Sequence, residues 1–185
     1  MKTTQSILYT GKSKNGTDIV IRYPKRSDLM ALWKYANRLS KEKTYITFQG
    51  EKISLKEETA WLEKVLMRVK KKQEVGLSIF AGRQVLGMCG IRLGQKIKPH
   101  VGSLGLSIDK DYRGEGLGKL LTTETLKEAK KKLTKLKMVT LEVFETNKNA
   151  YNLYLKLGFK EYGRLPKGLA HKGQLTGEIF MYKKM

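Results

Sequence analysis

The chain has 185 residues and a strongly basic composition, with 38 Lys and Arg against 17 Asp and Glu, a formal net charge of +21 and a pI near 10.0. This length suits one domain, and an apolar fraction of 40% excludes a wholly disordered chain. The charge favours an anionic partner such as nucleic acid, an anionic membrane face or a polyphosphorylated cofactor, because net charge constrains partners and not fold. We expect a single domain over residues 1–185.

The cysteine content and the N-terminal sequence indicate where in the cell the protein is expected. The one cysteine, Cys89, excludes an intramolecular disulfide, and together with His100 and His171 it is too little for a structural zinc site. The segment 1–10 has no signal-peptide pattern, and no run of 18 apolar residues occurs. We therefore expect no metal, no membrane partner and a cytoplasmic location.

Hydrophobic periodicity predicts that the chain opens with a strand and two helices. Polar and apolar residues alternate over 17–23, which is typical of a half-buried strand. The first helix is expected directly afterwards, with Ser27 or Asp28 as its cap. The second is expected from about Ser54, which can form a capping box with Glu57.

Strand and helix patterns then follow one another to the C-terminus. A period of two predicts strands at 75–81, 85–93, 103–108, 138–144, 159–163 and 177–182. Spacings of three and four predict helices at about 116–136 and 147–157. A Gly- and Lys-rich loop is expected between the last two strands. This order predicts an α/β (α+β) fold built on one mixed sheet.

A glycine-rich segment, Arg-Gly-Glu-Gly-Leu-Gly at 113–118, stands between a predicted strand and a predicted helix. Its bare backbone leaves free N–H groups at the positive end of the helix dipole, where a pyrophosphate would fit. The same glycines also suit a simple turn. The spacing does not match the dinucleotide motif G-x-G-x-x-G, and Leu120 after Lys119 disfavours a Walker motif.

Two blocks of the sequence resemble the GNAT superfamily of acetyl-CoA-dependent N-acetyltransferases. Arg113-x-x-Gly116-x-Gly118 is similar to the family pattern Arg/Gln-x-x-Gly-x-Gly/Ala. The segment NKNAYNLYLKLGF at 147–159 is similar to the family block Asn-x-x-Ala-x-x-Leu-Tyr-x-x-x-Gly-Phe. The resemblance covers about residues 17–183. It implies a mixed, mostly antiparallel central sheet with splayed parallel strands, flanked by helices.

The resemblance also implies a site for acetyl-CoA beside the first splayed strand. The strand's main chain would pair with the pantetheine arm, and the glycine-rich segment would bind the pyrophosphate, with added charge from Arg113 or Lys119. Asn147 is expected to contact the cofactor or cap a helix. The expected cofactor-binding residues are Leu106, Ser107, Ile108, Arg113, Gly114, Glu115, Gly116, Leu117, Gly118, Lys119 and Asn147.

Two residues are candidates for moving protons in such a site. The resemblance implies that Tyr154 protonates the departing thiolate, since a phenol keeps its proton at neutral pH; spacing alone also fits a core aromatic. Glu142 is the expected base, because its segment is similar to that of ribosomal-protein alanine N-acetyltransferases. A solvent-facing glutamate and a water-mediated base are the alternatives, and residues 75–107 contain no Asp or Glu. The oxyanion donor is expected to be a backbone N–H near Ile108.

The leading hypothesis is direct acetyl transfer, in a ternary complex, to a primary amine of a peptide, a ribosomal or other protein, or a small molecule. The alternative is a basic RNA- or ribosome-associated binding protein on the same fold without catalysis. The lysine runs 70–72 and 130–132 suit either solvated helix ends or such a surface. Net charge should repel polyamines and favour acidic or ribosome-bound acceptors, unless acidic groups at the cleft override it. A homodimer through C-terminal edge strands is also expected.

Overall fold

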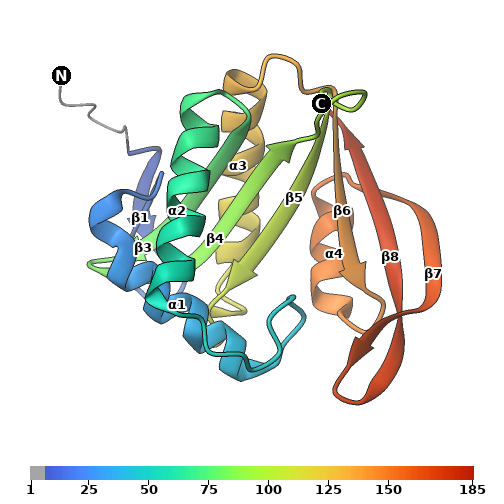
Figure 1. Ribbon diagram of the computed structural model, residues 1–185, viewed down its shortest axis with the longest axis horizontal. Coiled ribbons are helices and arrows are strands. Elements are labelled where there is room, and N and C mark those ends of the chain that lie inside the picture. The colour runs from blue at the N-terminus through green and yellow to red at the C-terminus, as the bar shows by residue number, and fades with distance from the viewer. Residues whose placement is uncertain (1–6) are drawn as a thin grey trace.

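Eight strands form one sheet, in the order β1-β2-β3-β4-β5-β6-β8-β7, in a computed structural model that describes residues 7–185 (Figure 1). The strands are β1 (Tyr9–Lys12), β2 (Asp18–Arg22), β3 (Glu74–Ala81), β4 (Gln84–Leu93), β5 (Val101–Ile108), β6 (Met138–Phe144), β7 (Lys160–His171) and β8 (Gln174–Lys184). The helices are α1 (Leu29–Glu42), α2 (Leu55–Lys70), α3 (Leu117–Lys132) and α4 (Lys148–Lys156), with short 3-10 turns η1 (Arg26–Asp28) and η2 (Lys110–Tyr112). None of the helices within residues 7–185 is long and apolar enough to cross a membrane.

Helices cover both faces of the sheet, so its central strands are buried on both sides. The helices α1 and α2 pack on one face, and α3 and α4 lie behind the other (Figure 1). Because side chains alternate along a strand, Ile79 joins the core under α3 while its neighbour Phe80 joins the core under α1 and α2. Cys89 is buried in the first of these cores, as the sequence predicts.

The parallel strands β5 and β6 define the centre of the molecule. They pair only where residues 101–103 meet residues 138–140, and every other pair in the sheet is antiparallel. Beyond this point the two strands diverge toward their C-terminal ends (Figure 1). The mixed, mostly antiparallel sheet with splayed parallel strands is therefore confirmed.

Helix termini test two local predictions. The capping box is confirmed: the Glu57 N–H donates to Ser54 Oγ, and the Ser54 N–H donates to the Glu57 carboxylate at 2.8 Å. Of the two caps predicted for the first helix, Asp28 is the N-cap residue of α1, but its side chain makes no hydrogen bond to the helix. The Asp28 carboxylate instead accepts hydrogen bonds from Arg22 at 2.6 and 2.9 Å and from the Lys25 N–H at 2.7 Å.

The largest departures from the predicted elements lie at the two edges of the sheet. Strand β1 is too short for its alternation to show in the sequence. The prediction of a Gly- and Lys-rich loop is wrong, because β7 and β8 form one long hairpin. Pro166 and Gly168 fall in an irregularity of the register between Leu165 and Leu169, and an edge strand tolerates both residues.

The predicted third helix also ends earlier than its apolar pattern. Helix α3 ends at Lys132, and Leu133 and Leu136 are buried in the turn that leads to β6. Their spacing reflects burial against the same core rather than continued helix.

Candidate functional site

The glycine-rich loop before α3 presents free backbone donors. Gly114 and Gly116 have φ values of +82° and +80°, which favour glycine, and Gly116 is the N-cap residue. The first hydrogen bond of the helix runs from the Leu120 N–H to the Gly116 carbonyl at 3.0 Å, so the N–H groups of residues 117–119 have no acceptor within the helix. A Cβ at either glycine would meet no atom within 4 Å. The loop is open and suited to an anion.

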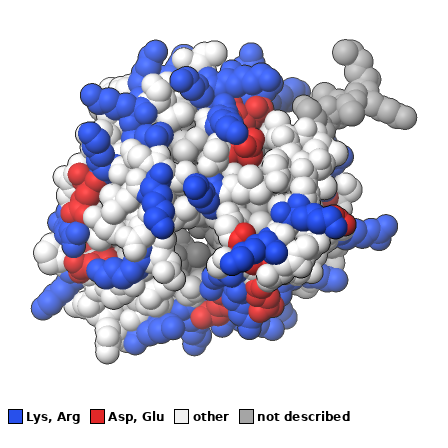
Figure 2. All heavy atoms as spheres, turned by 180° about the vertical axis from the view of Figure 1, so that it is seen from behind, with Lys and Arg blue, Asp and Glu red and all other residues white. Residues whose placement is uncertain are grey.

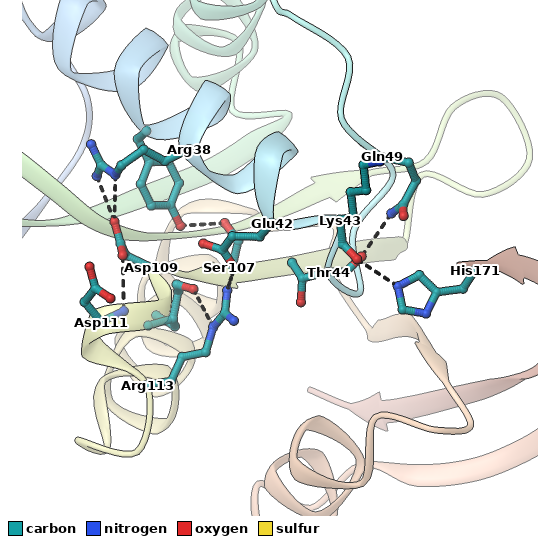
Figure 3. A network of polar contacts seen from close by, with 12 residues as sticks. Arg38, Glu42, Lys43, Thr44, Gln49, Ser107, Asp109, Asp111, Arg113 and His171 are labelled. Atoms are coloured by element: carbon teal, nitrogen blue, oxygen red, sulfur yellow. Dashed lines mark hydrogen bonds and ion pairs between the residues drawn. The ribbon is translucent and has the colours of Figure 1, made fainter. Parts of the chain in front are cut away.

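The two predicted phosphate-binding side chains are placed differently. The Arg113 guanidinium pairs with Glu42 at the end of α1 at 2.5 Å and donates from Nε to the Ile108 carbonyl at 2.9 Å (Figure 3). Lys119 is exposed in the first turn of α3. Arg113 therefore ties α1 to the end of β5, and Lys119 is the side chain free to approach a phosphate.

Polar contacts from α1 hold the end of β5 in place. The Tyr35 hydroxyl donates to Ser107 Oγ at 2.9 Å, and Arg38 donates twice to the buried Asp109 carboxylate, at 2.8 and 3.0 Å (Figure 3). These contacts turn the Ser107 side chain toward α1. They join the strand and the glycine-rich loop to a helix on the opposite face of the sheet.

The edge of β5 that faces β6 has free main-chain groups. The Asp109 N–H donates to the Leu86 carbonyl on β4 at 2.8 Å. Because main-chain groups alternate between the two sides of a strand, those of Leu106 and Ile108 point toward the gap beyond β5. The Ile108 carbonyl already accepts from Arg113 Nε, so the free groups are those of Leu106 and the Ile108 N–H. The structure thus brings the predicted strand edge and the glycine-rich loop together at one end of the gap.

Helix α4 brings Asn147 and Tyr154 to the other side of this gap. Asn147 caps the helix, since its side chain accepts a hydrogen bond from the Ala150 N–H at 3.2 Å. Tyr154 is 6% exposed and packs edge to face against Phe159, with ring centroids 5.7 Å apart. Burial raises the pKa of Tyr154, the nearby Cys89 adds to the shift, and no hydrogen bond to a described residue contributes. The phenol therefore keeps its proton throughout the neutral range.

Glu142 lies on β6 with its side chain on the face opposite α4. Its neighbours Leu141 and Val143 join the core that contains Tyr154, so alternation turns Glu142 to the other face, where it is exposed. Burial and the charge of Glu142 raise the pKa of Glu178 on β8. The sequence did not single out Glu178, because one glutamate in a strand carries no pattern.

An aromatic cluster joins three distant segments on this same face. Tyr45 follows α1, Phe144 ends β6 and His171 ends β7, and their ring centroids are 5.1 to 5.4 Å apart. A His171 ring nitrogen lies 3.0 Å from the Lys43 carbonyl oxygen (Figure 3). The cluster holds the loop after α1 against the far half of the sheet. No local pattern in the sequence marks it.

A cavity of about 400 Å³ lies between α1, α2 and the sheet face formed by β3, β4 and β5. Its floor includes Gly76, Gly90 and Gly105, which lie abreast because Gly90 pairs with Gly76 on one side and with Gly105 on the other. A Cβ at Gly105 would meet no atom within 4 Å. Because glycine has no side chain, these three residues leave room on one face of the sheet.

The acidic residues of this cavity differ in how they are compensated. Glu57 belongs to the α2 capping box, and Glu74 pairs with Arg68 at 3.5 Å. Glu58 is 6% exposed, and burial raises its pKa to about 7 with no opposing charge. The Ser78 hydroxyl, also in the lining, is buried without a hydrogen-bond partner among the described residues. Within residues 7–185, Glu58 belongs to no group of three side chains that could hold a metal ion.

We expect Glu58→Gln to stabilise the protein at pH 8 and to change it little at pH 5. A carboxyl whose pKa rises from 4.5 to about 7 on folding binds more protons in the folded state, so the free energy of unfolding falls as the pH rises through this window. The amide removes that cost, about 1–2 kcal/mol after solvent screening in the cavity. Thermal unfolding at both pH values measures this gain in stability, with Glu63→Gln on the same helix as control, since that carboxylate pairs with Arg26 outside the cavity. An equal gain at pH 5 and pH 8 would contradict the argument.

Solved structures that are similar to this one include acetyltransferases. An acetyltransferase of the GNAT family from Streptococcus pneumoniae is 27% identical, with a TM-score of 0.82 over 90% of this chain and 99% of that one. A ribosomal-protein-alanine N-acetyltransferase from Brucella melitensis is 23% identical, with a TM-score of 0.77 over 89% and 99%. A putative acetyltransferase from Salmonella typhimurium, solved with its cofactor acetyl-CoA, is 17% identical, with a TM-score of 0.77 over 90% and 93%. The last two show the likeness of fold.

Sequence comparison gives one curated relative and a family. A probable spermine N(1)-acetyltransferase from Bacillus subtilis subsp. natto is 41% identical over 78 residues, which span 42% of this chain and 45% of that protein. The chain thus matches less than half the length of that relative. The model of the acetyltransferase (GNAT) family matches residues 34–159, which include the glycine-rich loop, Glu142 and Tyr154. With this match added to the splayed strands and the open loop, the chain belongs to the GNAT family of acetyltransferases.

Proposed function

We propose that the protein transfers the acetyl group of acetyl-CoA directly to a primary amine in a ternary complex. The observation that carries this proposal is the free edge of β5 next to the open N-terminus of α3. An extended amide-bearing arm suits the first, and a pyrophosphate suits the second. Family membership and the S. typhimurium structure with acetyl-CoA support it.

The residues present fit this cosubstrate. The N–H groups of residues 114–119 would hold the pyrophosphate, with Lys119 adding a positive charge. The main chain of Leu106 and the Ile108 N–H would pair with the pantetheine amides, since the Ile108 carbonyl is taken by Arg113. Leu117 is buried and anchors the first turn of α3. Gly118 lies 3.4 Å, measured from an added Cβ, from Leu153 of α4, so a larger residue would push the two helices apart. The bound thioester supplies the acetyl group.

Proton transfer is assigned to two groups beside the gap that lie on opposite faces of the sheet. Tyr154 would give its proton to the departing sulfur, because its raised pKa keeps it protonated. Glu142, with Glu178 beside it, would accept the proton of the attacking amine directly or through water. A main-chain N–H near Ile108 would stabilise the negative charge that develops on the carbonyl oxygen.

The test is a two-substrate assay with purified protein. We would measure release of free CoA and the mass of the acceptor, using small aliphatic amines and a peptide with an N-terminal alanine. The names of the relatives motivate both acceptor classes. The proposal predicts a gain of one acetyl group per CoA released. Absence of acetyl-CoA binding in calorimetry, together with no CoA release, would overturn it.

A second candidate function, RNA binding, is favoured by a basic groove of about 580 Å³. The groove lies where α2 ends and β5 begins, away from the glycine-rich loop. Its basic residues are Arg68, Lys71, Lys72, Arg92 and Lys135. Lys and Arg side chains are also spread over the face behind the sheet (Figure 2). The groove is thus one concentration of charge on a generally basic surface.

We expect the triple variant Lys71→Glu/Lys72→Glu/Lys135→Glu to lower affinity for a 20-nucleotide single-stranded RNA at least tenfold. Each lost phosphate contact reduces counterion release, so the slope of affinity against salt should fall by about 2. Filter binding at several salt concentrations measures both. The matched control reverses the same charge at Lys130, Lys131 and Lys132, which are exposed at the end of α3. Equal losses in the two variants would assign RNA binding to net charge and not to the groove.

A further inference from the structure

We propose that the cavity between α1, α2 and the sheet binds the distal ammonium group of an aliphatic diamine or polyamine, with Glu58 as its anionic partner. This inference rests on the proposed acetyl transfer, whose acceptor it specifies. It is carried by a buried, uncompensated carboxyl that lines an apolar cavity beside β5.

The position of the cavity suits an acceptor. Residues 105–107 line it, and they belong to the strand whose other edge is proposed to hold the pantetheine arm. Gly105 contributes no side chain, so a ligand can lie against the main chain of β5. A molecule that fills the cavity therefore reaches the strand along which the acetyl group would be presented.

The charge of the cavity is opposite to that of the protein. Its lining contains three glutamates and no Lys, Arg or His, although the chain carries 38 Lys and Arg. Glu57 and Glu74 already have partners, which leaves Glu58 to pair with a ligand. An unpaired buried carboxylate is costly, and a bound ammonium would compensate it. The local field thus attracts the cations that the net charge of +21 repels.

The walls of the cavity select the rest of the ligand. They are mainly apolar and aromatic, and they include Tyr35, Leu39, Ile46, Phe48, Ile53, Trp61 and Val65. A methylene chain gains free energy by burial against such walls. A peptide acceptor would instead bury amide groups, for which these mainly apolar walls offer few partners. The combination of apolar walls and one anionic end fits an aliphatic amine with a second ammonium.

The first test compares 1,4-diaminobutane and spermidine with butylamine, an acceptor that lacks the second ammonium. We expect kcat/KM to be at least tenfold higher for the two polyvalent amines. Glu58→Gln should raise their KM at least tenfold and leave the values for butylamine within twofold. The matched control is Glu63→Gln on the same helix, whose carboxylate pairs with Arg26 outside the cavity and which should behave as wild type. Equal use of butylamine, or equal effects of Glu58→Gln on all three amines, would overturn the inference.

A second variant tests the cavity without relying on Glu58. Gly105→Leu places a side chain into the open space above β5, so calorimetry should show loss of spermidine binding and acetyl-CoA affinity within threefold of wild type. Retained spermidine binding would overturn the inference. The two proposals can fail separately. If the wild type does not bind acetyl-CoA, the proposed acetyl transfer is wrong. If the wild type acetylates amines with no preference for a second ammonium group, only the assignment of the cavity is wrong.

Discussion

We expect Gly116→Asp to weaken acetyl-CoA binding at least 100-fold. The substitution places a carboxylate at the N-cap of α3, next to the N–H groups assigned to the pyrophosphate, where it would occupy those donors and repel the ligand. It also forces a residue with a Cβ into a φ of +80°, which costs about 1 kcal/mol for an Asp. Calorimetric titration of wild type and variant with acetyl-CoA measures the difference.

Two further variants separate the causes of that loss. Gly116→Ala carries the backbone strain without the charge, so we expect a loss of about tenfold or less. Gly16→Asp introduces the same residue at a φ of +83° in the turn between β1 and β2, with open space around it, and should leave the affinity within twofold. Binding by Gly116→Asp within threefold of wild type would show that the phosphate lies elsewhere.

Local signals explain which parts of the fold were predictable from the sequence. The strand at 138–144 has the bounds that alternation predicts, and the Ser54 and Glu57 pair marks the start of α2, because both patterns depend on neighbours within a few residues. The hairpin of β7 and β8 depends instead on an edge position that accepts Pro166. An edge position is a property of the whole sheet, so the local composition suggested a loop.

The candidate site divides in the same way. The glycine-rich loop and Tyr154 lie in contiguous blocks, so their resemblance to a family could be found in the sequence alone. The partner of Arg113 could not be found in this way, because Glu42 is 71 positions away and comes near only through the packing of α1. Arg113 therefore looks like a phosphate ligand in the sequence and ties two elements together in the structure.

The cavity between α1, α2 and the sheet could not be predicted from the sequence for the same reason. The register of three strands places Gly76, Gly90 and Gly105 side by side. In the sequence these glycines are far apart, and no local pattern connects them. Glu58 follows Glu57 in the first turn of an amphipathic helix, where acidic residues usually face solvent. Trp61, one turn further along α2, is 38% exposed in the lining of the cavity. From the sequence, the net charge is expected to repel polyamines unless acidic groups at the cleft override it, and the three glutamates in the lining of this cavity are such groups.

We expect Tyr154→Phe to lower kcat between 100- and 1,000-fold while acetyl-CoA affinity stays within threefold. The substitution removes only the hydroxyl, so the ring contact with Phe159 and the packing of α4 remain. A general acid that protonates a leaving group contributes about 10²- to 10⁴-fold to the rate. Steady-state kinetics at saturating amine, with calorimetry of acetyl-CoA, measures the two quantities separately.

The matched control is Tyr151→Phe, one turn earlier on α4, whose hydroxyl donates to Glu161 at 3.0 Å. It should keep kcat within twofold of wild type. The selenoester analogue of acetyl-CoA gives a readout that lost packing would not move, because a selenol is acidic enough to leave without protonation. With this donor the deficit of Tyr154→Phe should shrink to less than tenfold. A deficit of the same size with both donors would assign Tyr154 to the core and require another source for the proton.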